Sequence, residues 1–336
     1  LMRANHAEAL IETDSSWSAM WQGQDVGAAR EFNNEQVVVH VLGALKTDIV
    51  AMQLQDIAQM RIDRVIPVML MLASKEEHCD AAIDGLVRIV RAVLRRSTYL
   101  AYLIENVDAL TRLTSLVARS SWVTDQIIAF PILLYELNDR RIRQLSVARK
   151  ALDGELREVL RTLDQGDAEA QMDTLRQFKL ATTLKIAELE LLGDISVMEA
   201  SDALTSLAET LLEASVEMAW THLESKHGLP CDESEQPLDE RFAIIAYGKT
   251  GGLELAYGSD LDLTFLCNDN LKGVTDGPTV INNNVFYLRV AQRVNHILTS
   301  RTRFGALYTT DFRLRPQGNK GRLVATLNAF EKYQNN

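Results

Sequence analysis

The sequence predicts an α+β protein, in which a long helical region precedes a small domain of strands and helix. Apolar residues recur at helical spacing through roughly residues 1–228, and short apolar stretches replace that spacing from about residue 241. Between the two regions, Gly228, Pro230 and Pro237 stand among acidic residues, a composition typical of a linker or exposed loop. We therefore expect a helical region at 1–228, a linker at 229–240 and a second domain at 241–336.

Several helices are expected in the first region. Apolar residues between 81 and 103 recur at helical spacing, which predicts one helix there. Pro131 interrupts an apolar stretch and is expected to start another helix at 132–137, because proline is tolerated in a first helical turn. Further helices are predicted at 180–192 and 204–220. We interpret their apolar stripes as core packing, and no fixed-period repeat indicates a solenoid.

The second region is predicted to contain three strands and one helix. The expected strands are 242–245, 261–266 and 307–314, and an amphipathic helix is expected at 285–298. Strand, strand, helix and strand within about 75 residues indicate a small α/β unit beside the helical region.

Composition limits the classes of function. Hydrophobic residues make up 47% and charged residues 24% of the 336 residues, as in ordinary globular proteins. A formal net charge of -11 argues against a nucleic-acid partner, because its long-range field repels polyanions. The longest apolar run, at 65–73, is about half of what a bilayer needs, and no secretory signal is visible, so no membrane partner is expected.

The cysteines and the first residue give two more expectations. Cys79, Cys231 and Cys267 lie far apart without a CxxC spacing, which favours reduced thiols and a cytoplasmic location. The chain begins with Leu1 rather than methionine, which is expected of a fragment.

The stretch AYGKTGGLELAYGSDLDLTFL, residues 246–266, carries the clearest chemical signal. Asp260 and Asp262 are two residues apart at the start of a predicted strand, so both carboxylates are expected on one face. A divalent cation between them would offset their repulsion, and carboxylate oxygens suit Mg²⁺ or Mn²⁺. Gly258 and Ser259 predict a tight turn before the strand, whose N–H groups and hydroxyl can hold nucleotide phosphates.

A third carboxylate, Asp311, occurs in LYTTDFRLRP on the last predicted strand. If the two strands are neighbours, Asp311 completes a site of three carboxylates, as in two-metal phosphoryl transfer. Arg313 and Arg315 are expected on the same strand face, where they balance its charge or bind phosphate oxygens. We also assign Asp311, as a hypothesis from chemistry, the uptake of the attacking hydroxyl's proton.

Each of these patterns has a plainer interpretation. A pair of aspartates in a strand is often a solvated edge, and Gly248, Gly251 and Gly252 are also consistent with ordinary turns. Lys249 is either solvated or a nucleotide-binding residue. Structural salt bridges are the alternative for Arg313 and Arg315. The turn before the paired aspartates and the third aspartate on a later strand favour the catalytic interpretation.

Three stretches resemble one family. AYGKTGGLELAYGSDLDL (246–263), LYTTDFRLRPQGNKGRLV (307–324) and AFEKY (329–333) resemble the glutamine synthetase adenylyltransferase/adenylyl-removing enzymes, of the DNA polymerase β-like nucleotidyltransferase superfamily. The helical stretches RIDRVIPVMLML, RRSTYLAYLIENVDALTRL and SSWVTDQIIAFPILLYEL resemble the region before the second catalytic domain of that family. The resemblance therefore covers nearly the whole chain.

The resemblance implies a polymerase β-like fold for the second domain and a specific chemistry. That family has one half that removes AMP from a tyrosine of glutamine synthetase by phosphorolysis and one that attaches AMP from ATP. YGSDLDL at 257–263 matches the attaching half. Asp260, Asp262 and Asp311 are then the metal ligands for Mg²⁺ or Mn²⁺, and Gly258 with Ser259 forms the triphosphate turn.

Partners and alternatives follow from the same resemblance. Glutamine synthetase is the implied protein substrate, with the PII signal protein and glutamine as implied regulators. Phosphorolytic removal of AMP and a non-catalytic docking fragment remain the alternatives. Two departures from the family pattern GYGKLGG, Ala246 and Thr250, remove no ligand. The chain stops at Asn336, where the family continues into a further helical region.

Overall fold

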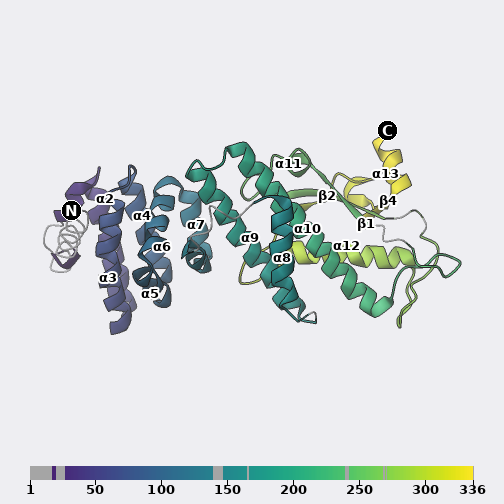
Figure 1. Cartoon of the computed structure of the whole chain (residues 1–336), viewed down its shortest axis with the longest axis horizontal. Helices are drawn as coiled ribbons and strands as arrows, with labels where there is room; N and C mark the ends of the chain where they lie inside the picture. The colour runs from purple at the N-terminus through teal and green to yellow at the C-terminus, as the bar shows by residue number, and fades with distance from the viewer. Residues whose placement is uncertain are drawn as a thin grey trace. The chain divides into compact units, whose positions relative to one another are not determined.

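The computed structural model describes residues 17–19, 27–138, 147–164, 166–238, 242–267, 269 and 271–335. This part of the chain is mostly helical with one small mixed sheet (Figure 1), which confirms the α+β class. Contacts divide the chain into two compact units. Unit 1 comprises Leu1–Gln144 and Ala187–Asp194, and unit 2 comprises Leu145–Ile186 and Ile195–Asn336. The linker predicted at 229–240 from composition stays a prediction.

Unit 1 is built from short helices whose apolar faces form one buried core. Its elements are η1 (Gly27–Glu31), α2 (Glu35–Met52), α3 (Asp56–Ala73), α4 (Cys79–Val93), α5 (Thr98–Glu105), α6 (Val107–Arg119), α7 (Ser121–Ala129) and the 3-10 helix η2 (Pro131–Asn138). Pro131 therefore starts a helical segment, as expected. The single helix predicted at 81–103 is wrong, because the polar stretch Arg95-Arg96-Ser97 ends the apolar spacing and Arg61 binds the Ser97 hydroxyl at 2.7 Å.

Unit 2 combines long helices with the sheet. Its elements are α8 (Arg149–Arg161), most of α9 (Ala168–Leu191), α10 (Val197–His227), β1 (Phe242–Tyr247), α11 (Gly248–Gly251), β2 (Leu261–Cys267), α12 (Asn283–Thr299), β3 (Thr310–Asp311), η3 (Gly318–Lys320), β4 (Val324–Thr326) and α13 (Leu327–Gln334). Helices α9 and α10 confirm the helices predicted at 180–192 and 204–220 and are longer than expected. A capping box of Ser196 and Glu199 fixes the start of α10.

The sheet has β2 at its centre. Strand β1 pairs with it antiparallel, whereas β3 and β4 pair with it in parallel. The strands predicted at 242–245 and 261–266 and the helix predicted at 285–298 are confirmed by β1, β2 and α12.

The strand predicted at 307–314 is too long, because only Thr310 and Asp311 join the ladder. Before β3, the Tyr308 N–H donates to the Leu298 carbonyl, and after it the Thr264 hydroxyl donates to the Leu314 carbonyl. These bonds replace sheet pairing on either side of β3.

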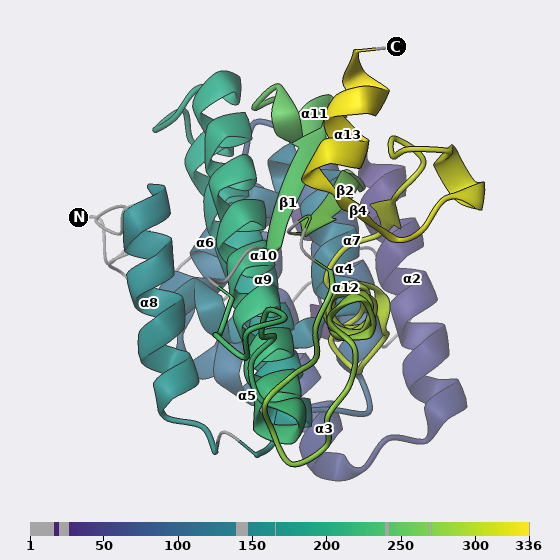
Figure 2. The ribbon, with the colours of Figure 1, turned by 90° about the vertical axis from the view of Figure 1, so that its right-hand side faces the viewer.

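Burial along β2 leaves one polar side chain accessible. Every residue of β2 is buried except Asp262, which is half-buried. One face of β2 packs on the core of α10 and α12, where Trp220 and Phe286 lie edge to face at 5.1 Å. Figure 2 looks nearly along the axis of α12, which contributes apolar residues to this core. Within the described residues, no helix combines the length and the apolar character that crossing a membrane needs.

Candidate active site

Two of the three predicted aspartates are direct neighbours across the sheet. Asp262 of β2 is the register partner of Asp311 of β3, and the strands are parallel. Partner residues in neighbouring strands lie about 4.8 Å apart and point to the same face. The expectation that these two strands are adjacent is therefore confirmed. Asp260 lies just before β2 and is exposed, two residues from Asp262.

The guanidinium of Arg313 binds Asp311 and lies within electrostatic range of Asp262 and Asp260. Its Nε donates to Asp311 Oδ2 at 2.6 Å, and the Arg313 backbone N–H donates to the other oxygen of Asp311 at 2.8 Å. The ion pair with Asp311 raises the pKa of Arg313, and the charges of Asp262 and Asp260 raise it further. All three aspartates thus act electrostatically on one cation.

The same contacts act on Asp311. Its hydrogen bonds with Arg313 lower the pKa of the Asp311 carboxyl below its ordinary value, so Asp311 is ionised at neutral pH. A carboxylate in this state is an acceptor only, as a metal ligand must be.

The three aspartates supply the donor chemistry that a divalent cation needs, but they do not form an assembled metal site among the described residues. In the part of the chain that the structure describes, no three His, Cys, Asp or Glu side chains are already gathered around a common metal position. Arg313 occupies Asp311, and its side chain is 72% exposed, so it is free to turn toward solvent. With Arg313 turned away, three hard oxygen donors remain, which is the ligand type that Mg²⁺ and Mn²⁺ prefer.

The first residue of helix α11, Gly248, lies in contact with the Asp262 carboxylate. A Cβ atom added to Gly248 would lie 2.3 Å from Asp262 Oδ2, and Gly248 has φ +57, in the left-handed region. Only glycine allows the turn after β1 to come this close to the carboxylate. The plain-turn interpretation of Gly248 was therefore incomplete, since this glycine shapes the site directly.

The predicted turn before β2 is present. Ser259 N–H donates to the Ala256 carbonyl at 3.1 Å, and the Ser259 hydroxyl accepts from Ala256 N–H at 3.1 Å. Gly258 has φ +75 with open space around it. The turn is thus closed by its own bonds, which use the Ser259 N–H, and Gly258 stays accessible. Phosphate binding by this turn stays a prediction.

The other two predicted basic residues lie in contrasting environments. Lys249 is exposed on α11 and has no side-chain partner among the described residues. Arg315 is buried, and its guanidinium donates to the Phe312 carbonyl at 3.0 Å and the Gly321 carbonyl at 3.5 Å. In this arrangement Arg315 holds the loop after β3 rather than facing Asp311. Nucleotide binding by Lys249 and Arg315 stays a prediction.

Helix α9 holds the segment that leads to Asp311, a feature the sequence did not reveal. The buried guanidinium of Arg176 donates to the carbonyls of Met172, Ile297, Ser300 and Gly305 at 2.6–3.0 Å. In the sequence, Arg176 looks like a solvated residue on a helix, and no local pattern indicates its contacts with these carbonyls.

Lys179 continues this contact one turn later. Its Nζ donates to the Leu307 carbonyl at 2.5 Å and lies 4.1 Å from the ring centre of Tyr308. Burial, with a smaller contribution from Arg176, lowers the pKa of Lys179 to about 8. Both basic residues of α9 thus fix the chain within a few residues of β3.

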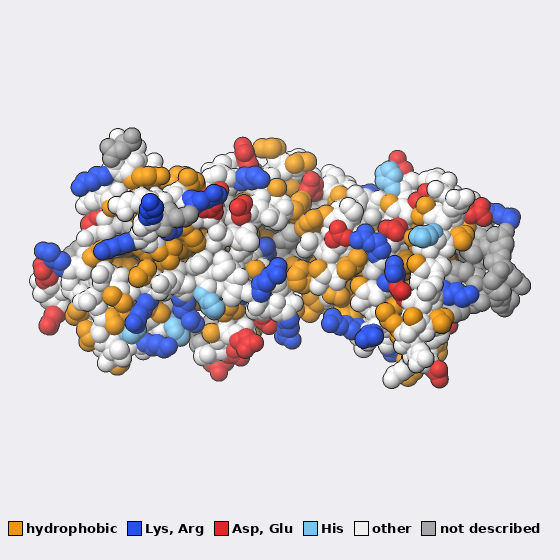
Figure 3. All heavy atoms as spheres, turned by 180° about the vertical axis from the view of Figure 1, so that it is seen from behind, with side chains coloured by type: hydrophobic (Ala, Val, Ile, Leu, Met, Phe, Trp, Pro, Cys, Tyr) orange, Lys and Arg blue, Asp and Glu red, His pale blue; other side chains and the backbone are white. Residues whose placement is uncertain are grey.

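The segment that carries Asp311 is basic in sequence despite the acidic chain. Residues 301–322 contain a single acidic residue, Asp311, and the basic residues Arg301, Arg303, Arg313, Arg315, Lys320 and Arg322. Figure 3 shows Lys and Arg side chains among hydrophobic ones on the C-terminal part of the molecule. Basic side chains of this kind attract small polyanions.

Comparison with known proteins identifies the family of the chain. The model of the family described as glutamate-ammonia ligase adenylyltransferase matches residues 110–336. The chain is 40% identical over 337 residues to the bifunctional glutamine synthetase adenylyltransferase/adenylyl-removing enzyme of Pseudomonas putida, covering 98% of the chain and 34% of that protein. The enzymes of the same name from Pseudomonas syringae pv. tomato and Hahella chejuensis are 40% and 38% identical, covering 97% and 98% of the chain and 34% and 35% of those proteins. The chain thus spans about a third of the length of these relatives.

Proposed function

The chain belongs to the glutamate-ammonia ligase adenylyltransferase family, and we propose that it carries the site that transfers AMP from ATP to a tyrosine hydroxyl of glutamine synthetase. Pyrophosphate is the leaving group. In this proposal the second domain is a polymerase β-like nucleotidyltransferase domain, in the adenylylating half of the longer enzyme.

One observation carries the proposal: the parallel register that places Asp262 beside Asp311, with Asp260 two residues before. Bound Mg²⁺ or Mn²⁺ would supply activation of the attacking hydroxyl and neutralisation of charge on the leaving pyrophosphate. Asp260, Asp262 and Asp311 would hold it. The accessible turn at Gly258 and Ser259 supports binding of the triphosphate next to these carboxylates.

The residues of the chain have separate tasks in this scheme. Lys249, exposed and without a partner among the described residues, is available to bind a phosphate oxygen. Arg313 would have to release Asp311 for that carboxylate to hold a cation, and its guanidinium would then be available to bind a phosphate oxygen. Asp311, ionised and on the side of β3, accepts the proton of the tyrosine hydroxyl.

The partners in the proposal follow from the family. Glutamine synthetase is the protein substrate, and we propose the PII signal protein and glutamine as regulators that act through the rest of the longer enzyme. Three buried free cysteines support a reducing compartment, the cytoplasm. Phosphorolytic removal of AMP is the second candidate function, because the matched relatives are named for both activities.

The experiment tests both the direction of AMP transfer and the role of Asp262. The chain is incubated with Mg²⁺, unmodified glutamine synthetase and ATP labelled at the α-phosphate, in parallel with Asp262→Asn and with Asp202→Asn, an exposed aspartate of α10 far along the chain from the site. We expect label on the synthetase with the parent chain and Asp202→Asn. We expect at least about 100-fold less with Asp262→Asn, since loss of metal-ion stabilisation costs several kcal/mol.

The outcomes separate the two candidate functions. Phosphate-dependent release of ADP from already modified synthetase, together with no transfer of label to unmodified synthetase, would replace the proposal by the removing activity. Equal labelling by Asp262→Asn would refute the assignment of the three aspartates.

A further inference from the structure

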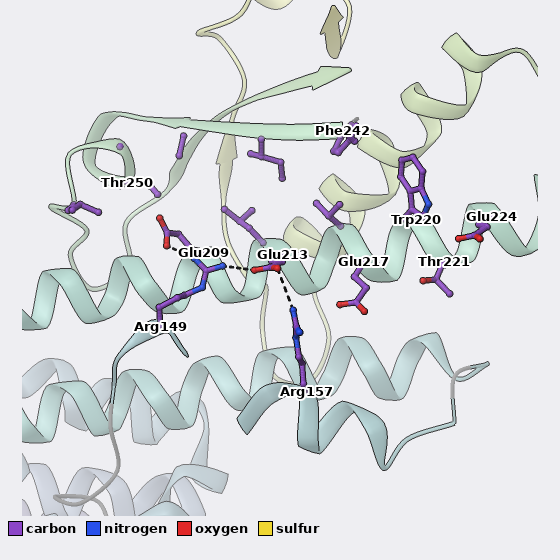
Figure 4. A pocket seen from close by; sticks show the side chains of 16 residues that line it. Arg149, Arg157, Glu209, Glu213, Glu217, Trp220, Thr221, Glu224, Phe242 and Thr250 are labelled. Atoms are coloured by element: carbon purple, nitrogen blue, oxygen red, sulfur yellow. Dashed lines mark hydrogen bonds and ion pairs between the residues drawn. The ribbon is translucent and has the colours of Figure 1, made fainter. Parts of the chain in front are cut away.

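A groove of about 870 Å³ lies between α10 and β1 in unit 2, away from the carboxylates. We call it the α10–β1 groove (Figure 4). Its apolar wall is formed by alternate residues of β1, including Phe242 and Ile244, and by Val216 and Trp220 of α10. At one end the groove is closed by Thr250 and neighbouring residues around α11. It is therefore a groove with an apolar wall along a strand and charged residues among the rest of its lining.

Strand β1 leaves one edge open along this groove. Within the described chain, its six residues, FAIIAY, make ladder bonds to β2 only, and no other strand pairs with them. An edge strand presents unpaired N–H and C=O groups, which natural proteins protect with charged residues, proline or a cover. This edge carries neither charge nor proline. It is thus suited to pairing with another extended segment.

Two residues that line the groove each carry a buried polar atom without a partner. The Trp220 indole N–H and the Thr250 hydroxyl are both buried without a hydrogen bond in the described part of the molecule. Buried polar groups are rarely left in this state. A segment that enters the groove brings backbone groups that can satisfy them.

The charges along the groove select the kind of segment. Arg149 binds Glu209 and Glu213, the latter at 2.6 Å, and Arg157 approaches Glu213 at 3.4 Å. Figure 4 shows these contacts at one part of the groove and Glu217 and Glu224 farther along α10.

Glu217 and Glu224 are exposed and have no cationic partner among the described residues. The lining contains four glutamates and two arginines, so it is net negative. Lys or Arg on the entering segment would complement it.

The length of the groove fits a short strand. From Glu209 to Glu224, α10 extends about 22 Å at its helical rise, which an extended segment of about seven residues matches. We propose that the α10–β1 groove binds an extended segment of a partner protein, which adds to the open edge of β1, points alternate apolar side chains into the groove and places Lys or Arg beside Glu217 and Glu224. This is strand addition, in which backbone bonds give affinity and side-chain pockets give specificity.

The bound segment would lie on the far side of α11 from Asp262. Thr250 of α11 lines the groove, whereas Gly248 of the same short helix touches the Asp262 carboxylate. The proposal does not rest on the proposed function, because binding is measured without ATP or metal.

The test uses a defined probe. A fluorescent peptide of about eight residues alternates valine with threonine and carries lysine at both ends. Two control peptides are used. In the first, glutamate replaces both lysines. In the second, alternate backbone nitrogens are methylated, which blocks strand pairing but keeps the side chains. Binding is measured by fluorescence anisotropy to the parent chain, to Glu217→Lys/Glu224→Lys and to Asp202→Lys, which makes one such charge reversal on α10 outside the groove.

We expect saturable binding of the lysine peptide to the parent chain and to Asp202→Lys. We expect it to weaken about tenfold in Glu217→Lys/Glu224→Lys, for loss of two exposed ion pairs. The glutamate peptide and the methylated peptide should bind at least about tenfold more weakly than the lysine peptide.

Four results would overturn the proposal. They are failure of the lysine peptide to bind the folded parent chain, equal binding of the methylated peptide, equal loss of binding in Asp202→Lys, and self-association of the parent chain through β1 that excludes the peptide. Circular dichroism of each variant establishes that the fold is intact.

Discussion

Replacement of Gly248 by alanine is expected to damage catalysis far more than folding. The added Cβ would lie 2.3 Å from Asp262 Oδ2, well inside the distance that two such atoms tolerate. The carboxylate is the movable partner, because the backbone of α11 is tied to β1 on one side and closed by the Gly252 N–H bond to the Gly248 carbonyl at 3.0 Å on the other. Asp262 must therefore turn away from the position that faces Asp311.

The magnitudes follow from these distances. Alanine at φ +57 costs about 1–2 kcal/mol of unfolding free energy, the usual penalty of the left-handed region for a residue with a Cβ atom. Restoring ordinary contact moves the carboxylate by about 1 Å, and a displacement of that size can reduce the rate about 100-fold. The expected signature is thus a large loss of AMP transfer with a small loss of stability.

Gly252→Ala is the matched control in the same turn. Gly252 has no positive φ, and its nearest neighbour to an added Cβ lies at 3.5 Å, an ordinary contact. Both variants are compared with the parent chain by transfer of labelled AMP and by urea unfolding. If Gly248→Ala transfers AMP at the parent rate, or if Gly252→Ala loses as much, the contact with Asp262 does not position the catalytic carboxylate.

Two further predictions concern the basic residues of the site. In Arg313→Gln, the pKa of Asp311 should rise toward its ordinary value and Mn²⁺ should bind severalfold more tightly at neutral pH, because the competing cation is gone; unchanged Mn²⁺ titrations would contradict this. For Lys179, the folded-state pKa of about 8 lies below the ordinary 10.5, so between these values the unfolded chain binds more protons and stability rises with pH. The unfolding free energy of the parent relative to Lys179→Met should therefore increase by on the order of 2 kcal/mol from pH 7 to pH 10, after allowance for partial exposure, and a flat difference in denaturant titrations would refute it.

Local patterns in the sequence were sufficient for the parts of the fold that are long and periodic. Strand β2 is buried on both faces, and its apolar run could be recognised together with the two aspartates at its start. Helix α12 was equally clear from its apolar spacing. The neighbouring positions of Asp262 and Asp311 followed from treating both as strand residues, and the register confirms this.

The remaining features depend on contacts between distant segments. Strand β4 has three residues and gains its structure from pairing with Phe265–Cys267, so no local period marks it. Arg315 was expected on the same strand face as Arg313, but the chain leaves the strand after Asp311 and the alternation ends. The bonds of Arg176 to carbonyls more than 120 residues away have no sequence signal at all.

Metal binding tests the central claim most directly. Mn²⁺ is titrated in the presence of ATP and followed by electron paramagnetic resonance, with the parent chain, Asp262→Asn and Asp202→Asn. We expect saturable Mn²⁺ binding in the parent and in Asp202→Asn, and loss of this binding in Asp262→Asn. The reason is that Asp262 is the neighbour of both other carboxylates: Asp260 precedes it by two residues, and Asp311 is its register partner on the adjacent strand. Equal Mn²⁺ affinity in the parent and Asp262→Asn would contradict it.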